Sequence, residues 1–136
     1  MKHRPAGKNL LILLCIASLP FISGCGGGSK STPEANLSVT TNPAVNTTQA
    51  PALGPFSLNV KITSAMPASG VTIAVKAAPD GTTNNFFTTS KNSTAASNDF
   101  SITGTPVAVV SVVTITVTSN STSTNTWTGS YRYSAK

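Results

Sequence analysis

From residue 56 to the end of the chain, apolar residues recur at every second position over several separate stretches. Residues 56–63 and 71–77 alternate Phe, Leu, Val, Ile or Ala with other residues, and residues 127–133 carry Trp, Gly and Tyr in the same rhythm. Successive side chains of a β-strand point to opposite faces, so this pattern predicts strands with one face in a core. No stretch beyond residue 24 shows the 3.6-residue period of an amphipathic helix. We therefore expect β-structure throughout this part of the chain.

Turn-forming residues divide this part of the chain into about seven short strands. Stretches rich in Gly, Pro, Ser, Asn or Asp lie at 67–70, 79–82 and 91–98, the last of which we expect to be a polar loop. Such a rhythm over roughly 100 residues is typical of an antiparallel β-sandwich. Through this rhythm, residues 36–136 resemble the immunoglobulin-like modules of bacterial envelope proteins. The Cys…Trp…Cys spacing of true immunoglobulin domains is absent, so a jelly roll or a small barrel is the alternative.

The sequence does not decide how two stretches take part in this fold. Residues 37–41 alternate like a strand, and a long Pro-bearing connection follows them up to residue 55. Its length indicates an edge segment or a mobile arm, and residues 37–41 belong either to the sheet or to the linker. In the run 107–118, the alternation changes phase between Val112 and Val113. This change fits a bulge, a late strand start or burial on both faces.

The N-terminus has the pattern of a secretory signal peptide. Basic residues, with Lys2 and Arg4 first among them, precede an apolar stretch at 10–22, and the small residues Ser23 and Gly24 follow it. That stretch is shorter than the roughly 20 residues that a membrane-spanning helix needs. Removal of residues 1–24 is therefore the prediction, rather than a transmembrane anchor.

Ile22-Ser23-Gly24-Cys25 resembles the lipobox of bacterial lipoproteins, which has a branched aliphatic residue, two small residues and an invariant cysteine. The resemblance implies that Cys25 becomes the N-terminus and binds the membrane through diacylglycerol and acyl chains such as palmitate. Gly26 is not aspartate, and by analogy with enterobacterial sorting this favours the outer membrane of the cell envelope. An ordinary signal peptide with an incidental cysteine is the alternative.

These features divide the chain into three parts. Residues 1–24 are the expected signal peptide. Residues 25–35 are rich in Gly and Ser and are expected to form a flexible tether with an end-to-end distance on the order of 20 Å. Residues 36–136 are the expected β-sandwich domain.

The chain beyond residue 24 lacks the side chains that most catalytic sites use. The one histidine of the full sequence, His3, lies in the expected signal peptide, and lipid attachment would occupy the thiol of Cys25. A Ser-His-Asp triad, a Cys-His pair or a zinc site therefore cannot be built there. The acidic residues of this part are Glu34, Asp80 and Asp99. Three separated acids favour neither a carboxylate pair nor a calcium loop, so we expect no enzyme, no cofactor and no metal.

The charged and aromatic residues limit the classes of partner that the chain is expected to bind. The basic residues beyond residue 24 are scattered, which argues against nucleic-acid binding. Trp127, Tyr131 and Tyr133 share one face of the last strand, where we favour a core role over an exposed platform for a sugar or a protein. A cavity lined by these residues would favour a ligand. Phe86 and Phe87 are adjacent, so in a strand they face opposite ways, and they are our candidate partner contact.

The sequence thus predicts a lipid-anchored, non-enzymatic module that contacts another envelope protein through a sheet edge or its end loops. It would be an accessory component of an envelope or secretion assembly. The alternative is a surface-exposed adhesive or glycan-binding lipoprotein, because the chain is rich in Ser and Thr.

Overall fold

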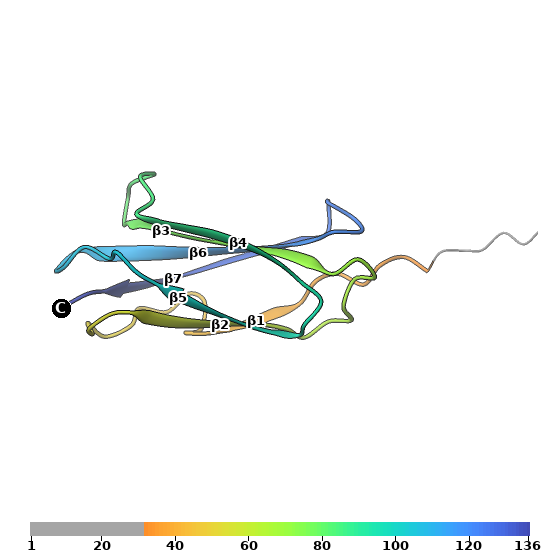
Figure 1. Cartoon of the computed structure of the whole chain (residues 1–136), viewed down its shortest axis with the longest axis horizontal. Coiled ribbons are helices and arrows are strands. Elements are labelled where there is room, and N and C mark those ends of the chain that lie inside the picture. The colour runs from red at the N-terminus through yellow and green to blue at the C-terminus, as the bar shows by residue number, and fades with distance from the viewer. Residues whose placement is uncertain (1–31) are drawn as a thin grey trace, which may run out of the picture. The chain divides into compact units, whose positions relative to one another are not determined.

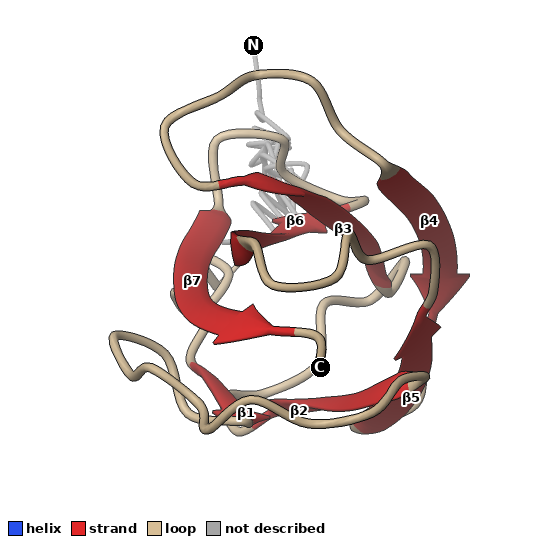
Figure 2. Cartoon of the chain, turned by 90° about the vertical axis from the view of Figure 1, so that its left-hand side faces the viewer, coloured by secondary structure: helices blue, strands red, loops and turns tan. Residues whose placement is uncertain are grey.

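The computed structural model describes residues 32–136, which fold into two antiparallel sheets packed face to face without a helix (Figures 1 and 2). One sheet has the strand order β1-β2-β5 and the other has the order β4-β3-β6-β7. The seven strands are β1 (Val39–Asn42), β2 (Phe56–Ile62), β3 (Val71–Pro79), β4 (Phe87–Ser93), β5 (Ser97–Ile102), β6 (Val110–Ser119) and β7 (Thr126–Ser134). The predicted all-β immunoglobulin-like sandwich is confirmed.

The place of β4 distinguishes this sandwich from a constant-type immunoglobulin domain. In such a domain the fourth strand lies in the sheet of the first, second and fifth strands. Here β4 pairs with β3 over the register from Val71↔Ser93 to Ala77↔Phe87, and the chain then crosses to the other sheet to form β5. Both β4 and β5 are therefore edge strands, and they lie on the same side of the sandwich (Figure 2).

The core lies between the sheets at the positions that the alternation indicates. Its most deeply buried large aliphatic side chains come from β2, β3, β5 and β6 and are at most 3% exposed: Leu58, Val60, Ile62, Val71, Ile73, Val75, Ile102, Val113, Ile115 and Val117. Leu37, which precedes β1, and Val39 of β1 join the same cluster and are 9% exposed. Tyr131 and Tyr133 of β7 belong to the same cluster, which confirms the predicted core role for these two side chains. Trp127 is partly buried and packs against the margin of the cluster.

The structure corrects the sequence prediction for residues 91–98 and decides among the alternatives for residues 107–118. The predicted polar loop at 91–98 is wrong, because β4 continues to Ser93 and β5 already begins at Ser97. These residues pair through backbone hydrogen bonds at sheet edges, where the side chains of Lys91, Asn92 and Ser97 are exposed. Asn98 is buried instead, and its amide donates to the Ala95 carbonyl (2.9 Å). In the run 107–118 the strand starts late, at Val110, and its register with β7 is unbroken, so there is no bulge. The phase changes because Ser111 takes the buried position before Val113, while Val110 lies on the exposed face.

The Pro-bearing connection before β2 is an edge segment. We call residues 43–52 the strap. The strap leaves β1 and runs parallel to β7, where the Asn46 N–H donates to the Ser130 carbonyl (2.7 Å) and the Gln49 N–H donates to the Arg132 carbonyl (2.8 Å). Gly129 allows this approach, since an added Cβ would lie 2.5 Å from the Trp127 ring and 2.6 Å from Val45. The strap therefore covers the free edge of β7.

The first described residues are also part of the sandwich. Val39–Asn42 pairs with β2, so the stretch 37–41, which the sequence assigned either to the sheet or to the linker, leads into the sheet. The Leu37 N–H donates to Asn125 Oδ1 (2.9 Å), and the Asn125 amide donates in turn to Glu34, which we expected in the flexible tether. Asn125 lies in the turn between β6 and β7. The chain thus enters the sandwich beside this turn.

Candidate functional site

The residues singled out by sequence have different positions. Cys25 lies outside the described residues. Phe86 precedes β4 and its N–H donates to the Ala77 carbonyl (2.9 Å), while Phe87 is the first residue of β4. Both rings are partly buried and pack against the core, so each keeps some exposed surface near the edge of the four-stranded sheet. Their role in a partner contact stays a prediction.

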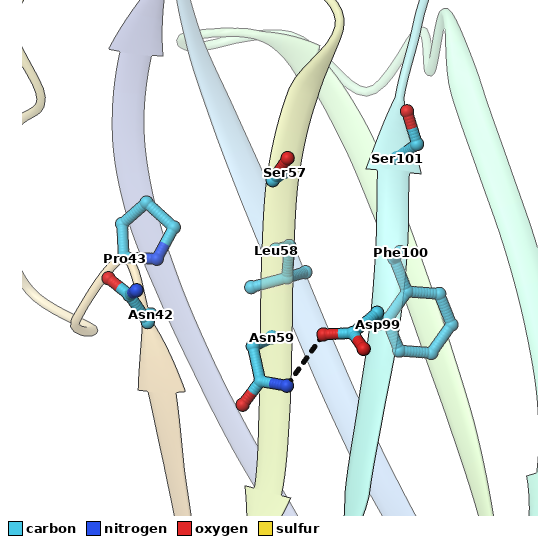
Figure 3. Close-up of a pocket in the computed structure, with 8 residues that line it drawn as sticks. All are labelled: Asn42, Pro43, Ser57, Leu58, Asn59, Asp99, Phe100 and Ser101. Carbon is cyan, nitrogen blue, oxygen red and sulfur yellow. Dashed lines mark hydrogen bonds between the residues drawn. The ribbon is translucent and has the colours of Figure 1, made fainter.

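A polar groove crosses the outer face of the three-stranded sheet (Figure 3). It has a volume of about 620 Å³, and the register places Asn42, Asn59 and Asp99 in one row across its strands. The Asn59 amide donates to Asp99 Oδ1 (2.7 Å) and to Ser97 Oγ (2.9 Å). One carboxylate paired with an amide can hydrogen-bond a polar ligand, but no general base or activated nucleophile accompanies it there.

An exposed ion pair joins the turn after β3 to β7. Arg132 Nε lies 2.8 Å from Asp80 Oδ2, and this hydrogen bond lowers the pKa of Asp80 and raises the pKa of Arg132. The pair therefore favours folding above the ordinary pKa of Asp80, and its contribution is lost as the pH falls through the lowered pKa. The side chains are 54% and 40% exposed, so water screens the pair and it contributes little to stability.

Four large apolar side chains are exposed at one end of the sandwich, and we call them the apolar end. Their exposed fractions are Leu53 77%, Val107 66%, Val110 48% and Val109 36%. Ala135 connects them, because it pairs with Ala52 on one side and with Val107 on the other. A hollow of about 350 Å³ lies beside them, lined in part by Pro55 and Val107.

The apolar end and the chain entry lie at opposite ends of the sandwich. β6 runs from Val110 at the apolar end to Ser119, which precedes the turn that binds Leu37. Ten strand residues at about 3.3 Å each separate these points by roughly 30 Å. Figure 1 shows the C-terminus near one end of the strands and the β6–β7 turn at the other.

A second cavity lies between the strap, β2 and β7. It has a volume of about 180 Å³ and is lined by Pro43, Gln49, Ala50, Ala52, Phe56, Ser57, Tyr131 and Tyr133. The phenol of Tyr133 is hydrogen-bonded to Thr105 Oγ1 (2.7 Å), whereas the buried hydroxyl of Tyr131 has no hydrogen-bond partner in the described part of the chain. Burial raises the pKa of Tyr131 above its ordinary value, so its hydroxyl keeps its proton at neutral pH.

Comparison of the chain with protein-family models, with curated proteins and with solved structures finds no match. Within residues 32–136, no helix is long and apolar enough to cross a membrane. The same residues bring no three His, Cys, Asp or Glu side chains together in a group suited to a metal ion. What these surfaces can bind follows from their own side chains.

Sequence reasoning missed both the apolar end and the cavity under the strap. Val107 and Val109 belong to a β-branched run that predicts burial, and Leu53 lies in a connection without a clear pattern. A cavity lined by Tyr131 or Tyr133 was the observation that would favour a ligand. Such a cavity is present although both side chains belong to the core.

Proposed function

We propose that the chain is a lipid-anchored protein of the bacterial cell envelope that acts as a non-enzymatic protein-interaction module. Cys25 holds it in the outer membrane, and the apolar end binds a second envelope protein. The proposal is carried by the position of the apolar end, about 30 Å from the chain entry beside Asn125. An anchor that precedes residue 32 is joined to the sandwich at its entry end, so the apolar end can face away from the membrane.

The side chains of the apolar end favour a protein partner with an apolar surface. Single exposed apolar residues are common on soluble proteins, but a contiguous group of them is typical of an interaction site. Leu53 and Val107 are more than half exposed; Val107 pairs with Ala135, and Leu53 follows Ala52, which pairs with Ala135 as well. Their burial by a partner would remove aliphatic surface from water, which stabilises a complex by about 25 cal/mol for each Å².

The free strand edges are weaker candidates for the same contact. The strap covers the edge of β7, and β1 is only four residues long. β4 carries Lys91 and β5 carries Asp99, and a charged edge residue opposes the addition of a further strand. The end loops are therefore the favoured contact, with Phe86 and Phe87 as a second apolar surface.

The polar groove favours the alternative function, a surface-exposed adhesive or glycan-binding lipoprotein. Hydroxyls and amides around the Asn59–Asp99 pair could hydrogen-bond a sugar on the open face of the sheet. This function requires that the protein lie on the outside of the cell. Protease treatment of intact cells separates the two proposals, because a chain that is fully protected cannot be an adhesin.

The apolar end is tested by the double variant Leu53→Asp/Val107→Asp. We expect it to recover at least tenfold less of the partner from detergent-solubilised envelopes than the unmodified protein recovers, because the two carboxylates would lose their hydration in the contact. Its free energy of unfolding should change by no more than about 0.5 kcal/mol for each site, since both side chains are mainly exposed. Quantitative mass spectrometry of the recovered proteins measures the loss.

The matched control carries the same two charges at the opposite end. Thr122→Asp/Thr124→Asp places them in the exposed turn between β6 and β7 and should keep partner recovery unchanged. If the unmodified protein recovers no specific partner, or if the Leu53→Asp/Val107→Asp variant recovers the same partner undiminished, the apolar end is not the interface.

A further inference from the structure

We propose that a polar cavity beside the turn after β3 binds a carboxylate group between Lys76 and Arg132. The cavity has a volume of about 260 Å³ and lies between that turn and the outer face of β3, β6 and β7. It shares no residue with the polar groove of the other sheet, and none of the four residues of the apolar end lines it. The site is therefore independent of the proposed partner contact.

Two cationic side chains border the cavity from opposite sides of β6. Lys76 of β3 pairs with Thr114 of β6, and Arg132 of β7 pairs with Val112, two positions along the same strand. All four residues line the cavity, and β6 lies between the two strands that carry the cations. The ammonium and guanidinium groups therefore border one ligand space.

Most hydrogen-bond donors of these two side chains are free within residues 32–136. Arg132 Nε donates to Asp80 Oδ2 (2.8 Å), which holds the guanidinium in place and leaves the four N–H groups of its two Nη atoms without an acceptor in that part of the chain. Lys76 forms no ion pair with any described residue. A carboxylate can accept two parallel hydrogen bonds from an arginine, and such charge-assisted bonds are about twice as strong as neutral ones.

The charges around the cavity favour a ligand with one negative charge. Lys76 and Arg132 contribute two positive charges and Asp80 one negative charge, which leaves +1, and no other charged side chain lines the cavity. The hydrogen bond from Arg132 lowers the pKa of Asp80, so that carboxylate stays ionised at neutral pH. One further carboxylate balances the remaining charge. A phosphate monoester carries roughly 1.5 to 2 negative charges at pH 7 and would leave an excess of negative charge beside Asp80.

The neutral residues of the cavity add further donors and an apolar floor. Asn85 contributes an amide and Thr114 a hydroxyl, and each can donate to an anion. Ala78 is buried and Val112 is half-buried, so these two side chains supply apolar surface beneath the polar groups. The lining fits a carboxylate that is carried on a small, partly apolar body.

Hydrogen bonds within the protein fix the wall that the turn after β3 forms. The Asp80 N–H donates to the Val110 carbonyl (2.9 Å), and Thr82 Oγ1 donates to the Pro79 carbonyl (2.9 Å). A preformed site loses little conformational freedom on binding. The first of these bonds also places the cavity next to Val110 of the apolar end. The carboxylate can therefore come from a free small acid or from an acidic side chain of the proposed partner.

The experiment titrates the mature lipoprotein, in an uncharged detergent, with acetate and with acetamide, which has the same shape without the charge. Arg132 is the one arginine beyond residue 24, so labelling of arginine with ¹⁵N gives a single Nε–H signal from the mature chain. At constant ionic strength, with chloride as the balancing anion, acetate should shift this signal in a saturable way and acetamide should not. Lys76→Gln should weaken acetate binding about fivefold, as expected for the loss of one exposed charge contact.

The matched control is Lys61→Gln, which removes an exposed lysine from the other sheet and should leave acetate binding unchanged. The proposal would be overturned if acetate gave no saturable shift, if acetamide gave the same shift, or if Lys76→Gln bound acetate as tightly as the unmodified protein. Tighter binding of inorganic phosphate than of acetate would overturn the assignment of a carboxylate.

Recovery of the envelope partner separates the two sources of the carboxylate. A reduced recovery with Lys76→Gln but not with Lys61→Gln assigns the group to an acidic side chain of the partner. Unchanged recovery with both variants assigns it to a free small acid. Because the acetate titration needs no partner, failure of the proposed function and failure of this site give different results.

Discussion

Gly70→Ala is expected to destabilise the sandwich by about 3 kcal/mol or more, well beyond the typical effect of one substitution. Gly70 precedes β3 and has a φ of +74°, a conformation that costs an alanine about 1–2 kcal/mol. An added Cβ would also lie 2.5 Å from the backbone oxygen of Ser93, which cannot rotate away as a side chain can. The backbone would have to shift, and with it the hydrogen bond from the Asn120 N–H to the Gly70 carbonyl (3.0 Å).

Gly81→Ala is the matched control for this substitution. Gly81 has nearly the same φ, +77°, but an added Cβ would meet nothing within 4 Å. It should therefore cost only the conformational part, about 1–2 kcal/mol. Chemical denaturation of the two variants measures the difference, which isolates the contact with Ser93. Equal destabilisation by both substitutions would show that the turn before β3 accommodates a side chain freely.

Cys25→Ala is expected to abolish attachment of lipid to the chain almost completely. The thiol of Cys25 is the group to which the lipobox resemblance assigns the thioether, and alanine has no atom that can form it. Cells grown with labelled palmitate should label the unmodified protein and leave the variant unlabelled. The variant should also keep residues 1–24, which mass spectrometry of its N-terminal peptide detects.

The control for this prediction is the other cysteine of the chain. Cys15→Ala removes a thiol within the expected signal peptide and keeps the lipobox intact, so both labelling and cleavage should persist. Labelling of the Cys25→Ala variant, or its loss in the Cys15→Ala variant, would contradict the assignment. The chain would then have to be treated as a secreted protein or as one anchored by other means.

Local periodicity predicted much of the fold. Residues 56–62 and 71–77 alternate because one face of each strand is buried, and the order of apolar and other side chains in the sequence shows this alternation. Tyr131 and Tyr133 were placed in the core by the same reasoning. The stretch 91–98 could not be predicted in this way, because edge strands with polar side chains carry no apolar alternation. Their pairing depends on backbone groups, which are the same in every sequence.

By itself, the sequence determined the class of fold, the core faces of the strands and a chain beyond residue 24 without histidine. Only the tertiary structure decided which surfaces are left for binding. The strap pairs with β7 through backbone hydrogen bonds, and no pattern in the sequence of residues 43–52 predicts this pairing. That pairing forms one wall of the cavity lined by Tyr131, and it brings Ala52 and Val107 to the two sides of Ala135, although these two residues are more than 50 positions apart in the sequence. Side-chain periodicity reports burial along one strand, whereas cavities and patches arise where distant segments meet.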